Sequence, residues 1–119
     1  MIHSKRLQLF VGLVAIAGTL AASSARGAEA DVAELWSKNC AICHGKDAKG
    51  DTKSGKQKGV KDLTDPKIHA ALKRDEMIKK MKDGILDEKT GKERMKPFKD
   101  KLDDAQLGAL ADWVLALKP

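Results

Sequence analysis

Apolar and polar residues alternate along the chain in a way that separates a leader from a folded part. Residues 7–22 form an almost continuous apolar run. From residue 31 onward, apolar positions recur three and four residues apart in several short stretches, which is the spacing of one helix face. We find no stretch with the every-second-residue pattern of a strand. The chain beyond the leader is therefore predicted to be all-α.

The opening and closing helices have the clearest signals. The opening helix is predicted to begin at Asp31, because Glu34 follows at the spacing of a capping box. This helix runs directly into residues 40–44. The closing helix is predicted to begin after Asp103, with Gln106 completing a second capping box. Its apolar face comprises Leu107, Leu110, Ala111, Val114 and Leu117.

Two shorter helices are predicted between them. Asp65 followed by Pro66 is the order of an N-cap and a first helical residue. Another helix is predicted to be capped at Asp75 and to end at Gly84. Two polar segments without an apolar period are predicted to be loops, residues 45–60 and 87–99.

The first thirty residues have the layout of a secretory signal peptide. Lys5 and Arg6 precede the apolar run, and small residues follow it. Ala28-Glu29-Ala30 fits the cleavage rule, with two alternatives a few residues earlier, so the chain divides into a leader, 1–30, and a mature domain, 31–119. An uncleaved anchor is the alternative, but the run is slightly short of a span and lacks a basic flank at its end. We expect export to a bacterial periplasm and no membrane attachment after cleavage.

The segment Cys40-Ala41-Ile42-Cys43-His44 is the strongest chemical signal in the sequence. Two cysteines three apart lie on one face of a helical turn, where both thiols can bond the vinyl groups of one haem. The histidine that follows can then bind the iron. We expect one covalent haem c, with Cys40 and Cys43 as thioethers and His44 as the proximal ligand. Since the chain has only two cysteines, one haem is the limit.

Three other interpretations of this motif fit less well. A thioredoxin-like pair would stand in a βαβ context, and strand does not alternate with helix here. A structural zinc site needs four ligands, and only His69 remains after the motif. A disulfide would explain both cysteines but leaves His44 without a role.

The composition agrees with a large cofactor inside a small domain. The chain has two Trp, two Phe and no Tyr, and Phe10 belongs to the leader. A domain of this size buries little apolar surface by itself. A buried haem would supply the missing apolar bulk.

With these motifs, the mature chain resembles the class I cytochromes c of the small bacterial monohaem periplasmic type. The features stand in the family's order: an aromatic residue in the first helix, Cys-x-x-Cys-His, a methionine segment and a closing helix with an aromatic residue. The resemblance implies the cytochrome c fold, with about four helices around one covalently bound haem. It also implies that the N- and C-terminal helices cross, with Trp36 and Trp113 packed at the crossing.

A methionine before the last helix is the distal iron ligand that this resemblance implies. Met95 holds the matching position, and Pro97 would stiffen the segment around it. Met77 and Met81 are alternatives, although they stand four apart on an amphipathic helix, where methionine is more often a core residue. His69 is a further alternative, but a histidine on a helix face is the plainer interpretation.

The resemblance further implies a backbone carbonyl that orients the proximal histidine. Family members often place a proline before the leucine of the haem pocket, and the proline carbonyl accepts the histidine proton. Leu63 matches that leucine, with no proline before it. We therefore expect a carbonyl near Lys61 to hold the ring of His44.

The distribution of charge bears on the partners. Loss of Lys5, Arg6, Arg26 and Glu29 with the leader lowers the formal net charge from +6 to +4. Nucleic acid is not expected as a partner of a nearly balanced chain without basic and aromatic residues interleaved. Six lysines form either a solvated loop or a positive rim that steers the haem edge toward acidic redox partners. They are Lys46, Lys49, Lys53, Lys56, Lys58 and Lys61.

These features predict a monomeric electron carrier and not an enzyme. A His/Met iron has no open site, so the protein would exchange one electron with periplasmic or membrane redox proteins. One alternative is a five-coordinate haem sensor or peroxidase-like enzyme, which requires Met95 not to bind the iron and has Arg94 as a nearby polar group. The other is a dedicated cytochrome subunit of a periplasmic oxidoreductase complex, which differs only in its partner.

Overall fold

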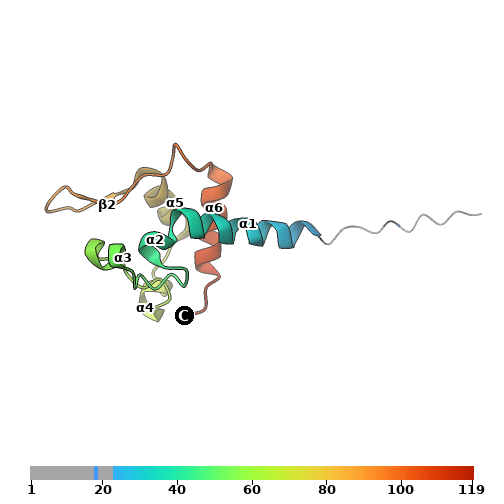
Figure 1. The fold of residues 1–119 in the computed structure, drawn as a ribbon, viewed down its shortest axis with the longest axis horizontal. Coiled ribbons are helices and arrows are strands. Elements are labelled where there is room, and N and C mark those ends of the chain that lie inside the picture. Colours follow the sequence, from blue (N-terminus) through green and yellow to red (C-terminus); the bar gives the residue numbers. More distant parts are fainter. Residues whose placement is uncertain (1–17, 19–22) are drawn as a thin grey trace, which may run out of the picture.

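The computed structural model describes Gly18 and residues 23–119, and their fold consists of helices around one small core (Figure 1). In chain order the elements are α1 (Ser23–Asn39), α2 (Ala41–His44), α3 (Lys53–Lys58), α4 (Pro66–Ala70), α5 (Arg74–Asp83), β1 (Ile85–Leu86), β2 (Glu93–Met95) and α6 (Asp104–Leu115). Helix α1 lies across α6, and α5 packs against α6 (Figure 1). The predicted all-α class, with its first and last helices crossing, is confirmed.

The crossing of α1 and α6 is the centre of the core. The rings of Trp36 and Trp113 pack there with their centroids 4.6 Å apart. Leu107 and Leu110 on α6 are fully buried. Burial of one leucine side chain contributes about 2 kcal/mol relative to exposure, so this small set holds the two helices together. The predicted packing of the two tryptophans is confirmed.

Two predicted helix starts are confirmed in their hydrogen bonds. The carboxylate of Asp103 accepts from the Gln106 amide at 2.8 Å, and the Gln106 side chain accepts from the Asp103 amide at 3.0 Å. This reciprocal pair satisfies two backbone donors at the start of α6. At the start of α4, Asp65 accepts from the amides of Lys67 and Ile68 at 2.9 and 3.1 Å.

The start of the first helix differs from the prediction. Helix α1 begins at Ser23 and not at Asp31, and Glu34 forms an ion pair with Lys38 at 2.6 Å in place of a capping box. Alanines in the segment 25–30 explain the longer helix, because alanine has the highest helix propensity. Most of the predicted leader, residues 1–17 and 19–22, lies outside the described residues. Among the helices that are described, none is long and apolar enough to cross a membrane.

The prediction of an unbroken loop over residues 45–60 was wrong, because α3 lies within it. The Thr52 hydroxyl caps this helix by accepting from the Gly55 amide at 2.9 Å. The only buried residue of α3 is Gly55. A helix that buries a glycine alone has no apolar period, so the pattern of apolar residues could not reveal it.

The structure of the region after α4 also differs from the prediction in detail. Helix α5 has its N-cap at Lys73, two residues before the predicted cap at Asp75, and it ends at Gly84 as predicted. The prediction of a strand-free loop over 87–99 was wrong, because β1 and β2 pair antiparallel with Ile85 opposite Met95. Strands of two and three residues are too short to show an alternating pattern.

Candidate functional site

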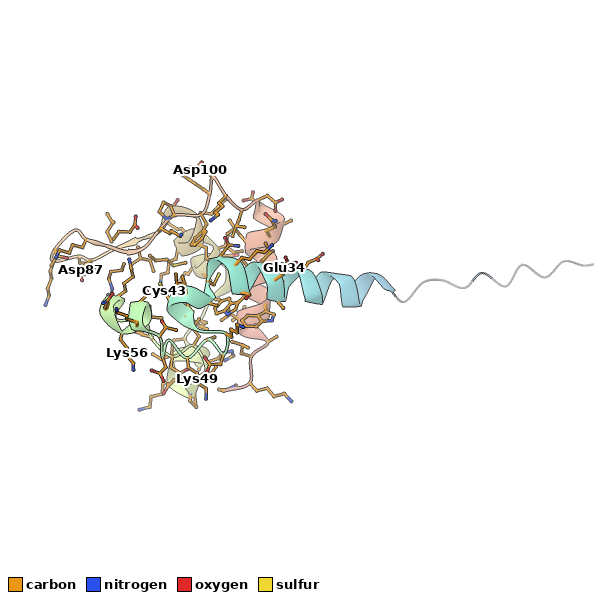
Figure 2. All side chains as sticks on the ribbon, viewed as in Figure 1. Glu34, Cys43, Lys49, Lys56, Asp87 and Asp100 are labelled. Carbon is orange, nitrogen blue, oxygen red and sulfur yellow. The ribbon has the colours of Figure 1, made fainter. Side chains whose placement is uncertain are left out.

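Cys40, Cys43 and His44 lie on one helical turn at the end of α1 and along α2. Figure 2 labels Cys43 on this turn. The Cys40 amide donates to the Trp36 carbonyl at 2.9 Å, and the His44 amide donates to the Cys40 carbonyl at 2.9 Å. These bonds continue the helical ladder across the break between α1 and α2. Both cysteines are free thiols, with Cys40 buried and Cys43 half-buried. The backbone therefore presents the three side chains from positions 40, 43 and 44 of one turn.

Burial sets the protonation of two of these groups. It raises the pKa of the Cys40 thiol to about 11. It lowers the pKa of the His44 imidazole from its ordinary value. At neutral pH, His44 is therefore a neutral imidazole, the form in which histidine binds a metal.

The ring of His44 is held beside Trp36. The two ring centroids are 5.5 Å apart, and the Trp36 indole donates to the Gly45 carbonyl at 2.9 Å. Nδ1 of His44 is buried and has no hydrogen-bond partner among the described residues. A buried polar atom without a partner costs about 1–3 kcal/mol and calls for an explanation. If the ring binds a metal through Nε2, Nδ1 is the nitrogen whose N–H donates to a carbonyl or a water.

The backbone carbonyl near Lys61 that we expected to orient His44 does not accept a hydrogen bond from its ring. A Cβ atom placed on Gly50 would lie 3.0 Å from the Val60 carbonyl oxygen and 3.4 Å from that of Lys61. Both oxygens therefore lie close to the backbone of Gly50. Leu63 is held by a hydrogen bond from its amide to the Ala48 carbonyl at 2.9 Å.

Helix α3 packs tightly against the backbone of the motif. The Thr52 hydroxyl donates to the Cys43 carbonyl at 2.7 Å while it caps α3. A Cβ atom on Gly55 would overlap the Cys43 carbonyl oxygen and would lie 2.5 Å from that of Gly50. Only glycine fits between these two carbonyls. The sequence shows the glycine but not the contact, because the two segments meet only in the folded chain.

A set of half-buried apolar side chains packs around the buried cluster to which Cys40 also belongs. Each packs against the buried cluster yet keeps part of its surface exposed. Such surface is suited to cover a large apolar ligand. With two thiols and a neutral imidazole on one turn, these residues fit a haem. The set from the middle of the chain comprises Leu63, Leu72, Met77, Ile78, Met81 and Met95.

Met95 stands on strand β2 and not in an irregular loop. Two contacts fix the segment around it. The Phe98 amide donates to the Met81 carbonyl at 2.8 Å. A Cβ on Gly84 would lie 2.6 Å from the Met95 carbonyl oxygen, so these backbones touch. Met77, Met81 and Met95 all reach the same core, and of the three only Met95 lies outside the helices.

The other polar residues that we considered at the iron have partners elsewhere. Nε2 of His69 lies 3.2 Å from the Val114 carbonyl oxygen and ties α4 to α6. The guanidinium of Arg94 donates to the Lys58 and Gly59 carbonyls at 3.2 and 3.0 Å. Over the described part of the chain, no group of three or more His, Cys, Asp or Glu is placed to hold a metal ion. Our sequence reasoning missed the role of Arg94, since its partners lie 36 and 35 positions away.

Comparison with known proteins agrees with this arrangement. The family model described as "Cytochrome C oxidase, cbb3-type, subunit III" matches residues 27–114. The solved structure "KustC0563 c-type cytochrome" is 26% identical, with a TM-score of 0.61 over 73% of this chain and 96% of that chain. A mutant of Kustc0563 is 28% identical, with a TM-score of 0.63 over 74% of this chain and 99% of that chain. No curated protein gives a significant match.

Proposed function

Because this chain belongs to the cytochrome c family described as cytochrome c oxidase, cbb3-type, subunit III, we propose that it is a periplasmic carrier of one electron on a single covalent haem c. Haem-based electron transfer follows from the family and from the c-type cytochrome fold. The observation that carries the finer proposal is the helical turn that brings together the thiols of Cys40 and Cys43 and the neutral imidazole of His44. Residues 1–30 would direct export and be removed.

In this proposal each site residue has one role. Cys40 and Cys43 would hold the haem through thioethers, His44 would bind the iron as the proximal ligand, and Met95 would bind it as the distal ligand. The haem supplies an iron that alternates between its ferric and ferrous states. The half-buried apolar side chains exclude water from it, which favours the less charged ferrous form.

The enzyme alternative lacks support from the residues that it would use. A sensor or peroxidase needs an open distal position with polar groups that act there. The side chains of Arg94 and His69 are held by backbone carbonyls of α3 and α6. The family description instead favours a second candidate, a cytochrome subunit of an oxidoreductase complex, which shares the chemistry and differs in its partner.

The absorption spectrum of the purified protein tests the proposal directly. We expect one haem per chain, a weak near-infrared charge-transfer band in the ferric form, and no rapid binding of carbon monoxide by the ferrous form. The reason is that a methionine sulfur fills the sixth position. Rapid binding of carbon monoxide by the wild-type protein would contradict the carrier proposal and favour a sensor or enzyme.

The lysines after the motif predict that the rate of electron transfer depends on the charge of the redox partner. Some are already paired: Lys56 lies 2.8 Å from Asp51. Lys46 and Lys49 are exposed and follow α2 directly. Changing both to Glu is expected to slow oxidation of the ferrous protein by anionic ferricyanide relative to cationic hexaamminecobalt by about tenfold at low salt. Each oxidant takes one electron from the ferrous iron.

The matched control for this experiment is Lys99→Glu/Lys101→Glu. These lysines flank Asp100, which lies at the opposite end of the molecule from Lys49 in Figure 2. The control makes the same change in net charge, so a purely global effect would slow both double variants alike. If the ratio of the ferricyanide rate to the hexaamminecobalt rate is the same in the two double variants, there is no positive rim at the haem edge.

A further inference from the structure

Arg94 joins the methionine strand to the end of α3. Its Nε donates to the Lys58 carbonyl at 3.2 Å, and a terminal guanidinium nitrogen donates to the Gly59 carbonyl at 3.0 Å. A third bond runs in the opposite direction, from the Lys58 ammonium to the Glu93 carbonyl at 3.3 Å. The last carbonyls of a helix lack partners within it and carry the negative end of its dipole. The rigid fork of a guanidinium suits such a pair of acceptors.

The start of the same short helix is attached to the cysteine turn. Thr52 donates to the Cys43 carbonyl at 2.7 Å, and Gly55 is in contact with that carbonyl as well. The amide of Val60 donates to the Gly55 carbonyl at 2.9 Å, which fixes the end of α3 to its middle. Helix α3 therefore touches the segment of Cys43 and His44 at one end and the strand of Met95 at the other (Figure 1).

Met95 directly follows Arg94 and is half-buried against the core. Its strand is short and exposed elsewhere: Glu93 and Arg94 both face solvent. A displacement of Arg94 away from α3 would carry Met95 with it, because successive Cα atoms are about 3.8 Å apart and linked by a planar peptide.

We propose that Arg94 is a positioning residue that clamps β2 onto α3 and so keeps Met95 in place as the distal iron ligand. This inference rests on the proposed function, since it requires Met95 to bind the iron. Through α3, the clamp connects the two segments that supply the axial ligands. Loss of the clamp would leave Met95 free to move away from the iron, while the thioether bonds of Cys40 and Cys43 stay intact.

Competition with imidazole measures how firmly the Arg94 clamp keeps Met95 on the iron. Added imidazole binds the ferric iron only after the methionine has left, so its apparent affinity reports how readily Met95 departs. In the full-length haem protein, Arg94→Gln is expected to raise the apparent affinity for imidazole by about tenfold, the effect of losing a hydrogen bond from a charged donor. Arg94→Lys keeps the charge without the fork, and an increase of about threefold is expected.

Arg74→Gln is the matched control. It removes the same charge from an exposed arginine whose Nε lies 2.7 Å from Asp112, on the α5–α6 side of the molecule. We expect its imidazole affinity to stay within about twofold of the wild type. Urea unfolding of both Gln variants separates a loss of global stability, which a merely structural arginine would also cause, from the specific change in imidazole affinity.

The outcomes distinguish a failure of this inference from a failure of the proposed function on which it rests. A wild-type protein without the near-infrared band, or with an imidazole affinity unchanged by Met95→Ala, would overturn both. If the wild type shows the band but Arg94→Gln and Arg74→Gln bind imidazole equally, only the clamp is wrong. Should Arg94→Gln fail to retain haem, Arg94→Lys decides, and an affinity equal to the wild type would overturn the inference.

Discussion

Replacing Met95 by alanine is expected to abolish the near-infrared charge-transfer band and to let the ferrous protein bind carbon monoxide rapidly. The physical reason is that the alanine side chain leaves the sixth iron position open. We also expect the reduction potential to fall by on the order of 0.2 V, a fraction of the ~0.8 V range over which axial ligands set haem potentials. Absorption spectroscopy and a redox titration of the full-length haem protein measure all three changes.

The two helical methionines are the controls for this experiment. Met77→Leu and Met81→Leu conserve side-chain volume, so each should cost less than about 1.5 kcal/mol of stability. Both variants should keep the band and the potential of the wild type. If either of them loses the band while Met95→Ala keeps it, the distal ligand is a methionine of α5 and not Met95.

A single methyl group on Gly55 is expected to destabilise the protein by about 3 kcal/mol, the upper part of the range for overpacked sites. The added carbon would overlap the Cys43 carbonyl oxygen and press on that of Gly50, and both are backbone atoms that cannot rotate away. In an open helix the same change would stabilise by about 1 kcal/mol, because alanine has the higher helix propensity. The sign of the effect therefore reports the packing of α3 against the motif. Denaturant unfolding followed by circular dichroism measures it.

Gly108→Ala is the matched control for that substitution. Gly108 also lies inside a helix and is buried, but a Cβ there would meet only the end of the flexible Arg74 side chain, at 2.9 Å. Arg74 can move, so we expect this variant to be as stable as the wild type or slightly more stable. Equal stabilities for Gly55→Ala and Gly108→Ala would show that α3 does not pack against the motif as described.

Much of the fold follows from short-range signals. The capping box of Asp103 and Gln106 and the cap at Asp65 were predicted correctly because each is a local hydrogen-bond pattern whose partners lie within three residues. The haem that the family implies could also be predicted from a local signal. The spacing of Cys40, Cys43 and His44 within one helical turn is enough to indicate haem attachment.

The mistakes have three causes: deciding contacts that lie far apart in sequence, elements that leave no periodic pattern, and competition between two local signals. Helix α3 buries only Gly55, and the hairpin of β1 and β2 is too short to alternate. The start of α1 was misplaced because the cap signal at Asp31 lies within a helix that alanines extend toward Ser23. The Lys61 carbonyl oxygen lies close to Gly50, and Nδ1 of His44 has no partner among the described residues; the local sequence does not determine either arrangement.

By itself, the sequence determined which residues with haem-binding chemistry stand close together: two thiols and an imidazole on one turn, and a methionine before the last helix. Those features depend on spacing along the chain, and helical geometry converts spacing into proximity without any help from the rest of the fold. Only the tertiary structure decided that Gly55 packs against the Cys43 carbonyl and that Arg94 bridges β2 to α3. Those contacts join separate segments, and burial of the core around Trp36 and Trp113 is what brings the segments together.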